Sequence, residues 1–251
     1  DIYAVWGISG GDQKVHKYAE ASDSWGSAVA TITDLVTDSI VFTDAGGTTH
    51  LVFAHYDSGG SGYTYTSDGA SWTTDTTDAK YLTVWDDRLW GIDHGGQLWY
   101  SYTIGTEIND CQLPAPDGWV TALFVARNAM GTPIIYASTL DGLFAHDAEN
   151  SRFVETQMTF PTHPDNGRGT TKWRDSVYIP SGLGIYKYIN GSNSAVITPV
   201  GPDRDDGMPS SYRGSVQMLA GTHNELLAGI DATTAPVSVG ATDIPQNYSS
   251  G

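Results

Sequence analysis

The densest group of metal-binding side chains lies in the segment GPDRDDGMP, residues 201–209. Asp203, Asp205 and Asp206 resemble the start of an Asp-x-Asp-x-Asp-Gly calcium loop, in which oxygen ligands at alternate positions surround one cation. The third carboxylate and the glycine are shifted by one position, and no glutamate follows at the required place. We therefore expect a rigid loop bounded by Pro202 and Pro209, with the three aspartates as secondary metal candidates and no cofactor.

The other metal-binding and nucleophilic residue types do not form a recognisable site. The seven histidines show no zinc-ligand spacing. His50 and His55 are five residues apart in one predicted strand, so their side chains should point to opposite faces. Cys111 is the only cysteine, which excludes an intrachain disulfide. We expect its thiol to be a small buried group rather than a nucleophile.

The sequence can be compared with the residue requirements of two hydrolase mechanisms. A site that binds a sugar carboxylate through three converging arginines, with a tyrosine nucleophile, is the arrangement of sialidases. Their Arg-Ile-Pro motif is missing, and YIP at 178–180 places Tyr178 where the arginine would be. A glycoside hydrolase with paired carboxylates stays open, with acidic residues at strand ends as the source: Asp44, Asp86, Asp87 and Asp175. Most aspartates lie beside Gly, Ser or Thr, where turn formation explains them, so we predict a non-enzymatic protein.

Charge and hydropathy narrow the classes of partner. The 251 residues include 29 acidic and 12 basic side chains, which gives a net charge of −17. Such a chain is repelled by polyanions, so we expect no nucleic-acid partner. No window approaches 18 consecutive apolar residues, so we expect no membrane insertion. No signal peptide is visible, and the start at Asp1 rather than Met leaves room for a leader or a larger N-terminal part.

The elements that must position any site are short strands in a repeated order. An alternating apolar run recurs six times, as IYAVWGI (2–8), HLVFAHY (50–56), RLWGIDH (88–94), PIIYAST (133–139), SVYIPSG (176–182) and ELLAGID (225–231). The starts are 48, 38, 45, 43 and 49 residues apart. Aromatic runs such as GYTYTSDG and QLWYSYT follow the turns. A period of 40–50 residues is the size of one four-stranded propeller blade.

Further candidate strands precede most of these runs, at 39–45, 81–87, 120–126, 169–175 and 215–221. We predict an all-β protein, a β-propeller of four-stranded antiparallel blades with about six blades, or part of a longer ring. A two-sheet sandwich is the alternative, but it would not repeat the order of strand types. The prediction is one domain over 1–251, with repeat units at roughly 1–36, 37–78, 79–117, 118–166, 167–212 and 213–251.

The order of strands predicts where each one lies. The first strand of each unit follows a long connection, so we expect it to line a central axis. The second strand should be the most buried, because adjacent blades cover both of its faces. The first run, at 2–8, has no strand before it, and the last unit has only a further candidate at PVSVGAT (236–242). Helix should be nearly absent.

One hairpin carries a specific motif. The segment from Thr66 to Trp72 resembles the Asp-box, Ser/Thr-x-Asp-x-Gly-x-Ser/Thr-Trp, a turn between outer strands of many propellers, shortened by one residue between Asp68 and Gly69. Asp68 should accept hydrogen bonds from turn amides, Gly69 should supply a positive φ, and Trp72 should cover the hairpin base beyond Ser71. Asp-boxes occur in enzymes, receptors, lectins and virion proteins, so the motif indicates architecture.

Several phrases resemble propeller segments in structural proteins of tailed bacteriophages: YLTVWDDRLWGID, ASTLDGLFAHDA, SVYIPSGLGIYKY and VGPDRDDGMPSSYRG. The resemblance covers residues 79–232. It implies a virion structural or receptor-facing adhesion module, located in the virion or outside the cell, within an oligomeric assembly whose partners are other virion or tail proteins.

A carbohydrate-binding propeller is the alternative function, with a cell-surface glycan as partner. Sugars stack on exposed aromatic faces, and the chain has eight tryptophans. Most should fill the space between blades. Trp25 and Trp119 lie beside glycine and acidic residues, so they are the predicted ligand-facing aromatics.

Overall fold

The computed structural model describes residues 1–7, 12–57, 60–128, 130–174, 176–182, 184–190, 195–201 and 215–231. These residues form β-strands joined by turns, and η1 (Glu20–Ser22) is a single 3₁₀ turn. The expected all-β class with several four-stranded antiparallel sheets is confirmed. No helix in the described ranges is long and apolar enough to span a membrane. The chain divides into two compact units, Asp1–Gly118 and Trp119–Gly251.

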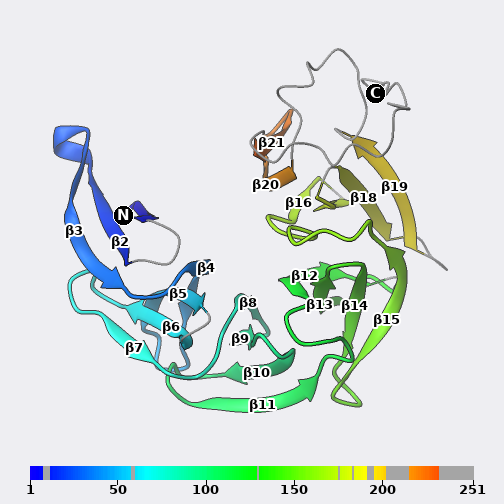
Figure 1. Ribbon diagram of the computed structural model, residues 1–251, viewed down its shortest axis with the longest axis horizontal. Helices are drawn as coiled ribbons and strands as arrows, with labels where there is room; N and C mark the ends of the chain where they lie inside the picture. Colours follow the sequence, from blue (N-terminus) through cyan, green and yellow to red (C-terminus); the bar gives the residue numbers. More distant parts are fainter. Residues whose placement is uncertain are drawn as a thin grey trace. The chain divides into compact units, whose positions relative to one another are not determined.

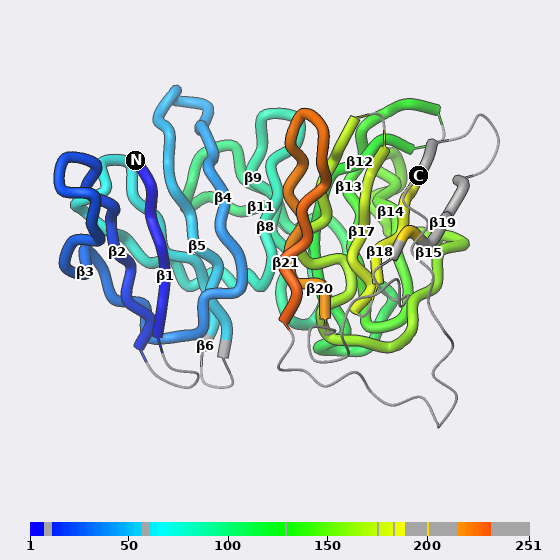
Figure 2. Tube along the Cα trace, turned by 90° about the horizontal axis from the view of Figure 1, so that it is seen from above, coloured from blue at the N-terminus to red at the C-terminus, as the bar shows by residue number. Residues whose placement is uncertain are grey.

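The first unit holds three antiparallel sheets, and Figure 2 shows their strands in colours from blue through cyan to green. In each sheet, strands that follow one another in sequence are hydrogen-bonded neighbours. The first sheet has three strands and the others have four. Their bounds are β1 (Tyr3–Gly7), β2 (Gln13–Ala19), β3 (Ser24–Ile32); β4 (Val36–Thr43), β5 (Thr49–Asp57), β6 (Gly60–Thr66), β7 (Thr73–Asp75); and β8 (Tyr81–Trp85), β9 (Arg88–Ile92), β10 (Gln97–Ser101), β11 (Glu107–Gln112).

The second unit repeats this plan with two four-stranded sheets and a pair of strands (Figure 1). Their bounds are β12 (Val120–Arg127), β13 (Pro133–Thr139), β14 (Gly142–Asp147), β15 (Arg152–Thr159); β16 (Thr171–Trp173), β17 (Ser176–Pro180), β18 (Ile185–Asn190), β19 (Ala195–Gly201); and β20 (Ser215–Gly221), β21 (Leu226–Asp231). The candidate strand at 236–242 lies outside the described residues.

The order of strands within each sheet distinguishes the alternatives considered from sequence. The described strands form six separate sheets, each a meander of consecutive strands, rather than two packed sheets. Each sheet falls within one residue of the bounds of one predicted repeat. The runs predicted to begin each unit are the first strands β4, β8, β12, β16 and β20, although β16 is only three residues long. The first sheet lacks a strand before β1, as the sequence indicated.

The second strand of each four-stranded sheet is largely buried, as predicted. In β9, all four residues from Leu89 to Ile92 are buried, so both faces of the strand are covered. The same holds for the end of β13 and for β17. The prediction was wrong for β21, whose residues are half-buried or exposed. Among the described residues, its sheet packs on the β16–β19 sheet through Val216 and Leu219 of β20.

In the first unit, side chains from successive sheets form two apolar clusters. The cluster between the first and second sheets is built around Val15, Ile32 and Phe53. The cluster between the second and third sheets includes the fully buried rings of Tyr63 and Trp99. The hydroxyl of Tyr63 donates to Glu107 and accepts from the amide of Gly105, so this buried polar atom is satisfied across the contact.

In the second unit the larger cluster joins the sheets β12–β15 and β16–β19. It contains Phe124, Tyr136, Ile179 and Tyr188, and the hydroxyls of Tyr136 and Tyr188 lie 3.2 Å apart. A smaller cluster around Tyr178 and Val216 joins β16–β19 to β20–β21. Within each unit, therefore, apolar packing between neighbouring sheets holds the strands together.

One close contact in these clusters gives a direct test of the fold. Gly91 of β9 lies opposite Trp99 of β10, and a Cβ at Gly91 would come within 2.1 Å of the indole ring. Gly91→Ala should therefore force the ring out of a filled core and lower the free energy of unfolding by about 1–3 kcal/mol. Urea unfolding of the full chain, followed by tryptophan fluorescence, measures this.

The matched control is Gly95→Ala, in the turn that follows β9. A Cβ there would meet only ordinary contacts, at 3.5 Å and 3.8 Å. Its free energy of unfolding should stay within about 0.5 kcal/mol of the original chain. Equal stabilities of the two variants would contradict the position of Trp99 over Gly91.

Candidate functional site

The first sheet has two unlike faces. Val5 and Val15 are paired across β1 and β2, and their face packs against the second sheet. Residues at alternate positions point the other way, because side chains alternate along a strand. On that face lie Trp6 of β1, His16 and Tyr18 of β2, and Trp25 of β3, which we call the aromatic face.

The rings of the aromatic face contact one another in a row. Trp6 stacks on His16, with ring centroids 3.9 Å apart and planes 13° from parallel. Trp6 meets Trp25 edge to face at 5.6 Å, and Trp25 meets Tyr18 at 5.4 Å. Both tryptophans remain 44% exposed. Large apolar groups exposed together in this way indicate a contact surface.

Polar groups surround these rings. The hydroxyl of Tyr18 donates to the carboxylate of Asp23, and this bond raises the pKa of the tyrosine. His16 Nδ1 donates to the carbonyl of Gly26 at 2.8 Å, so Nε2 is the ring nitrogen that this bond does not use. Lys14 Nζ donates to Thr31 Oγ1 at 2.9 Å beside the same face. The aromatic face therefore combines flat rings with hydrogen-bonding atoms.

The two predicted ligand-facing tryptophans have different positions. Trp25 is exposed, and it is joined by Trp6, which sequence reasoning missed. Trp6 follows Val5 in a regular β1–β2 register, so alternation along the strand was the signal that could have found it. The two register shifts lie between β2 and β3 and affect the position of Trp25 instead, which sequence does not reveal. Trp119 is half-buried and belongs to the second unit, where its carbonyl accepts from the amide of Leu140. It is therefore not part of the aromatic face.

The Asp-box hairpin connects β6 to β7. One carboxylate oxygen of Asp68 accepts from the amides of Ala70 and Ser71 at 2.8 Å and 2.7 Å, and these bonds lower its pKa. Thr66 Oγ1 donates to the same oxygen and accepts from the amide of Gly69, whose φ is +71°. These hydrogen bonds stabilise the turn.

The tryptophan of this hairpin has a packing role. Trp72 stacks on Phe53 of its own sheet, with centroids 5.8 Å apart, and meets Tyr3 of the first sheet edge to face at 6.3 Å. A Cβ at Gly69 would come within 2.1 Å of the Tyr3 hydroxyl, so glycine is also needed for the close approach of that side chain. The hairpin thus fastens the sheet that carries the aromatic face.

One arrangement in the first unit resembles a catalytic relay. Asp34 accepts from His55 Nδ1 at 3.0 Å, and His55 Nε2 lies 3.1 Å from Thr64 Oγ1. However, His55 is 3% exposed and Thr64 is 5% exposed, and the hydroxyl of Thr74 lies 2.9 Å from that of Thr64. A substrate carbonyl cannot reach the Thr64 oxygen, so the relay satisfies buried polar groups.

The strand-end carboxylates that the structure describes have roles in turns. Asp44 accepts from the amides of Gly46 and Thr48, and its other oxygen lies 3.1 Å from His50. Asp86 and Asp87 form a turn with positive φ at both residues. Asp175 and the candidate calcium ligands Asp203, Asp205 and Asp206 lie outside the described residues.

The described arginines have separate partners, so no three of them converge. Their contacts are Arg88 with the rings of Tyr100 and Tyr102, Arg127 with the carbonyl of Gly131, Arg152 with Asp147, Arg168 with Asp165, and Arg174 with the ring of Trp173. Among the residues that the structure describes, the converging set required by the sialidase arrangement is missing.

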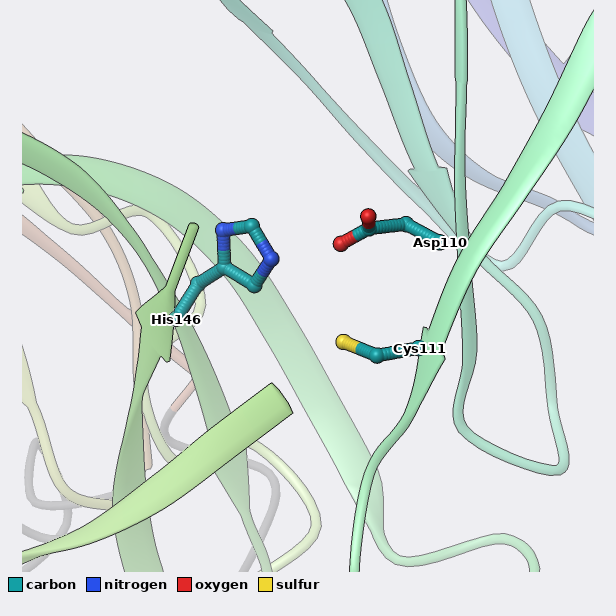
Figure 3. A group of neighbouring side chains, drawn as sticks. All are labelled: Asp110, Cys111 and His146. Atoms are coloured by element: carbon teal, nitrogen blue, oxygen red, sulfur yellow. The ribbon is translucent and has the colours of Figure 1, made fainter. Parts of the chain in front are cut away.

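The single thiol is buried, as expected. Cys111 pairs with Leu98, and a register shift leaves its neighbour Asp110 as the extra residue of a bulge in β11. Their side chains consequently point in a similar direction, as Figure 3 shows; His146, also drawn there, lies on β14 of the second unit. Burial and the nearby Asp110 carboxylate raise the pKa of the thiol to about 12. The thiolate that a nucleophile requires is therefore disfavoured.

No family model matches the chain, and no curated protein matches it. Solved structures do match. The computationally designed protein Ika8 is 14% identical, with a TM-score of 0.53, over 94% of this chain and 70% of that protein. Sqt1 of Saccharomyces cerevisiae is 10% identical, with a TM-score of 0.55, over 91% and 66%.

An auxiliary nutrient binding protein from Bacteroides thetaiotaomicron is 9% identical, with a TM-score of 0.53, over 87% of this chain and 60% of that protein. The chain thus spans less than two thirds of the length of this protein and of Sqt1. At these identities, the similarity concerns the fold alone.

The buried relay makes stability depend on pH. Burial lowers the pKa of His55 from 6.5, although Asp34 acts in the opposite direction. Because the folded state resists protonation, the stability contributed by neutral His55 is present above pH 6.5 and lost as the pH falls through the folded pKa. Urea unfolding between about pH 7.5 and about pH 5.5 should show a slope of up to ~1.4 kcal/mol per pH unit.

His55→Gln should flatten that slope, because an amide does not titrate in this range. His223→Gln removes an exposed histidine from the β20–β21 hairpin and controls for the loss of any histidine. If the His55 variant kept the full slope, another group would be responsible.

Proposed function

We propose that the chain is a non-enzymatic β-propeller module of about six four-stranded blades that attaches to carbohydrate through the aromatic face. In this arrangement the first strands β4, β8, β12, β16 and β20 line a central axis. The exposure of Trp6 and Trp25 in one contacting row is the observation that carries the proposal.

Carbohydrate suits this surface for chemical reasons. The C–H-rich face of a pyranose packs against an aromatic ring, while its hydroxyls need hydrogen-bond partners at the edge of the ring. The exposed indole rings of Trp6 and Trp25 provide the first, and Asp23 and His16 provide the second. The net charge of −17 disfavours polyanionic glycans, so a neutral sugar is the expected ligand.

A non-enzymatic role is supported by the fate of the groups that could do chemistry. The relay at His55 is buried, Asp44 and Asp68 serve as turn acceptors, and the thiol of Cys111 has a raised pKa. Each of these groups has a structural use that accounts for its geometry.

The setting that we propose is a virion, at or near a phage tail, where the module faces a receptor and is held by other virion proteins in an oligomeric assembly. This proposal rests on the sequence phrases that resemble phage propeller segments. A receptor-facing adhesion module and a glycan-binding surface are compatible, since the second supplies the contact that the first requires.

The test is binding of the full chain to an array of neutral glycans. Trp25→Ala and Trp6→Ala should each lower the affinity for the bound glycan at least about tenfold, because removal of a central aromatic side chain typically costs more than 1 kcal/mol. Tyr102→Ala removes an aromatic side chain that is 43% exposed outside the aromatic face, and it should bind like the original chain.

Either of two results would refute the proposal. One is the absence of glycan binding by the original chain. The other is unchanged binding by the two tryptophan variants, which would place the contact elsewhere on the protein.

A further inference from the structure

The sheets β12–β15 and β16–β19 of the second unit follow one another in the chain (Figure 1). A cavity of about 220 Å³ is lined by residues of both sheets. Its apolar wall includes Ala126, Val177 and Tyr188, which belong to the cluster that joins these sheets. Arg127 and Lys172, both exposed, lie at its rim. The cavity therefore has a buried apolar part and a charged entrance.

The two cations at this rim have no ion-pair partner among the described residues. Acidic residues outnumber basic ones by 29 to 12, yet no ion pair joins Arg127 or Lys172 to a carboxylate of the residues that the structure describes. Arg127 Nη1 donates to the carbonyl of Gly131, which holds the guanidinium in place and leaves its other N–H groups for a ligand. Two such cations beside one cavity favour an anion.

Hydroxyl groups complete the lining. Ser176 contributes one, and Tyr188 contributes another, 3.2 Å from the hydroxyl of Tyr136. Burial and the bond to Tyr188 raise the pKa of Tyr136, so its hydroxyl stays protonated. It can donate to the Tyr188 oxygen, and the Tyr188 hydrogen is then available to an acceptor in the cavity.

The size and the apolar wall restrict the anion. An engineered apolar cavity of about 150 Å³ in another protein is large enough to bind benzene. A cavity of about 220 Å³ can therefore hold a compact ring or branched chain with one charged group. A hydrated inorganic anion would leave the wall of Ala126 and Val177 without apolar contacts.

We propose that this cavity binds a small organic carboxylate with a compact apolar body of about ten non-hydrogen atoms. The carboxylate lies between Arg127 and Lys172, and the apolar body packs on Ala126 and Val177. The site is separate from the aromatic face, which belongs to the first unit, so the two proposals can fail independently.

Calorimetric titration of the full chain with benzoate tests the proposal, with benzamide as the neutral analogue of the same shape. Benzoate should bind saturably with one site per chain, and benzamide should bind at least about tenfold more weakly. Arg127→Gln and Lys172→Gln should each weaken benzoate binding at least about tenfold, because each removes a charge from the rim.

Two variants control this experiment. Lys187→Gln removes a cation from β18 whose side chain points to the opposite face from Tyr188, so benzoate affinity should change less than about twofold. Ala126→Leu places a larger side chain in the apolar wall beside Val177 and Tyr188, and it should abolish binding while the chain still unfolds cooperatively.

Three results would overturn the proposal: no saturable binding of benzoate, equal losses for Lys187→Gln and Arg127→Gln, or competition by inorganic phosphate as strong as that by benzoate. The last result would assign the rim to simple anions and leave the apolar wall without a role.

Discussion

The structure depends on the fact that the second strand of a typical sheet is apolar on both faces. Leu89 points to one face of β9 and Trp90 and Ile92 point to the other, and all three are buried. A sheet with such a strand cannot leave either face in water, so both of its faces must be covered. Each sheet therefore needs apolar neighbours, and a repeated strand order supplies them, because every repeat has the same apolar second strand.

Large rings fill the space between sheets, and their polar atoms are satisfied across that space. The Tyr63 hydroxyl bonds to Glu107 and to the amide of Gly105, and the hydroxyls of Tyr136 and Tyr188 meet each other. A buried hydroxyl without a partner would cost about 1–3 kcal/mol, so these bonds also fix how neighbouring sheets face each other. Gly91 of β9 leaves room for the ring of Trp99 on β10, and a larger residue at this position would collide with that ring.

Much of the acidic character follows from the turns rather than from a ligand. Asp44, Asp68 and Asp93 each accept hydrogen bonds from amides of the turn that follows them. Asn128 closes the β12–β13 hairpin in the same way, by accepting from Met130 and Thr132. Since an amide oxygen serves as well as a carboxylate, the turns require an acceptor and not a charge. These described carboxylates are therefore accounted for by the turns in which they lie.

Features that depend on local residues could be predicted from the sequence, and features that depend on packing between sheets could not. Alternation and turn residues determine strands and their order locally, so the runs that became β5, β9, β13 and β17 were visible, as was the Asp-box turn. The exposure of β21 was not visible, because the burial of a strand depends on the sheets that cover it and not on its own sequence. The contact of Trp25 with Tyr18 depends on register shifts between β2 and β3, and the cavity at Arg127 depends on packing between two sheets. Neither has a local signature.

The exposed faces of the first and last described sheets in the sequence differ in a way that bears on the proposed function. Met218 and Leu227 share the exposed face of β20–β21, and their aliphatic side chains offer neither a flat ring nor a strong hydrogen-bonding atom. On the aromatic face, His16 fixes the ring of Trp6 by stacking, and Asp23 fixes Tyr18 through its hydroxyl. Rings held before a ligand arrives lose little conformational entropy when it binds. Preorganisation, more than exposure itself, is therefore the property of the aromatic face that supports the proposal of ligand binding.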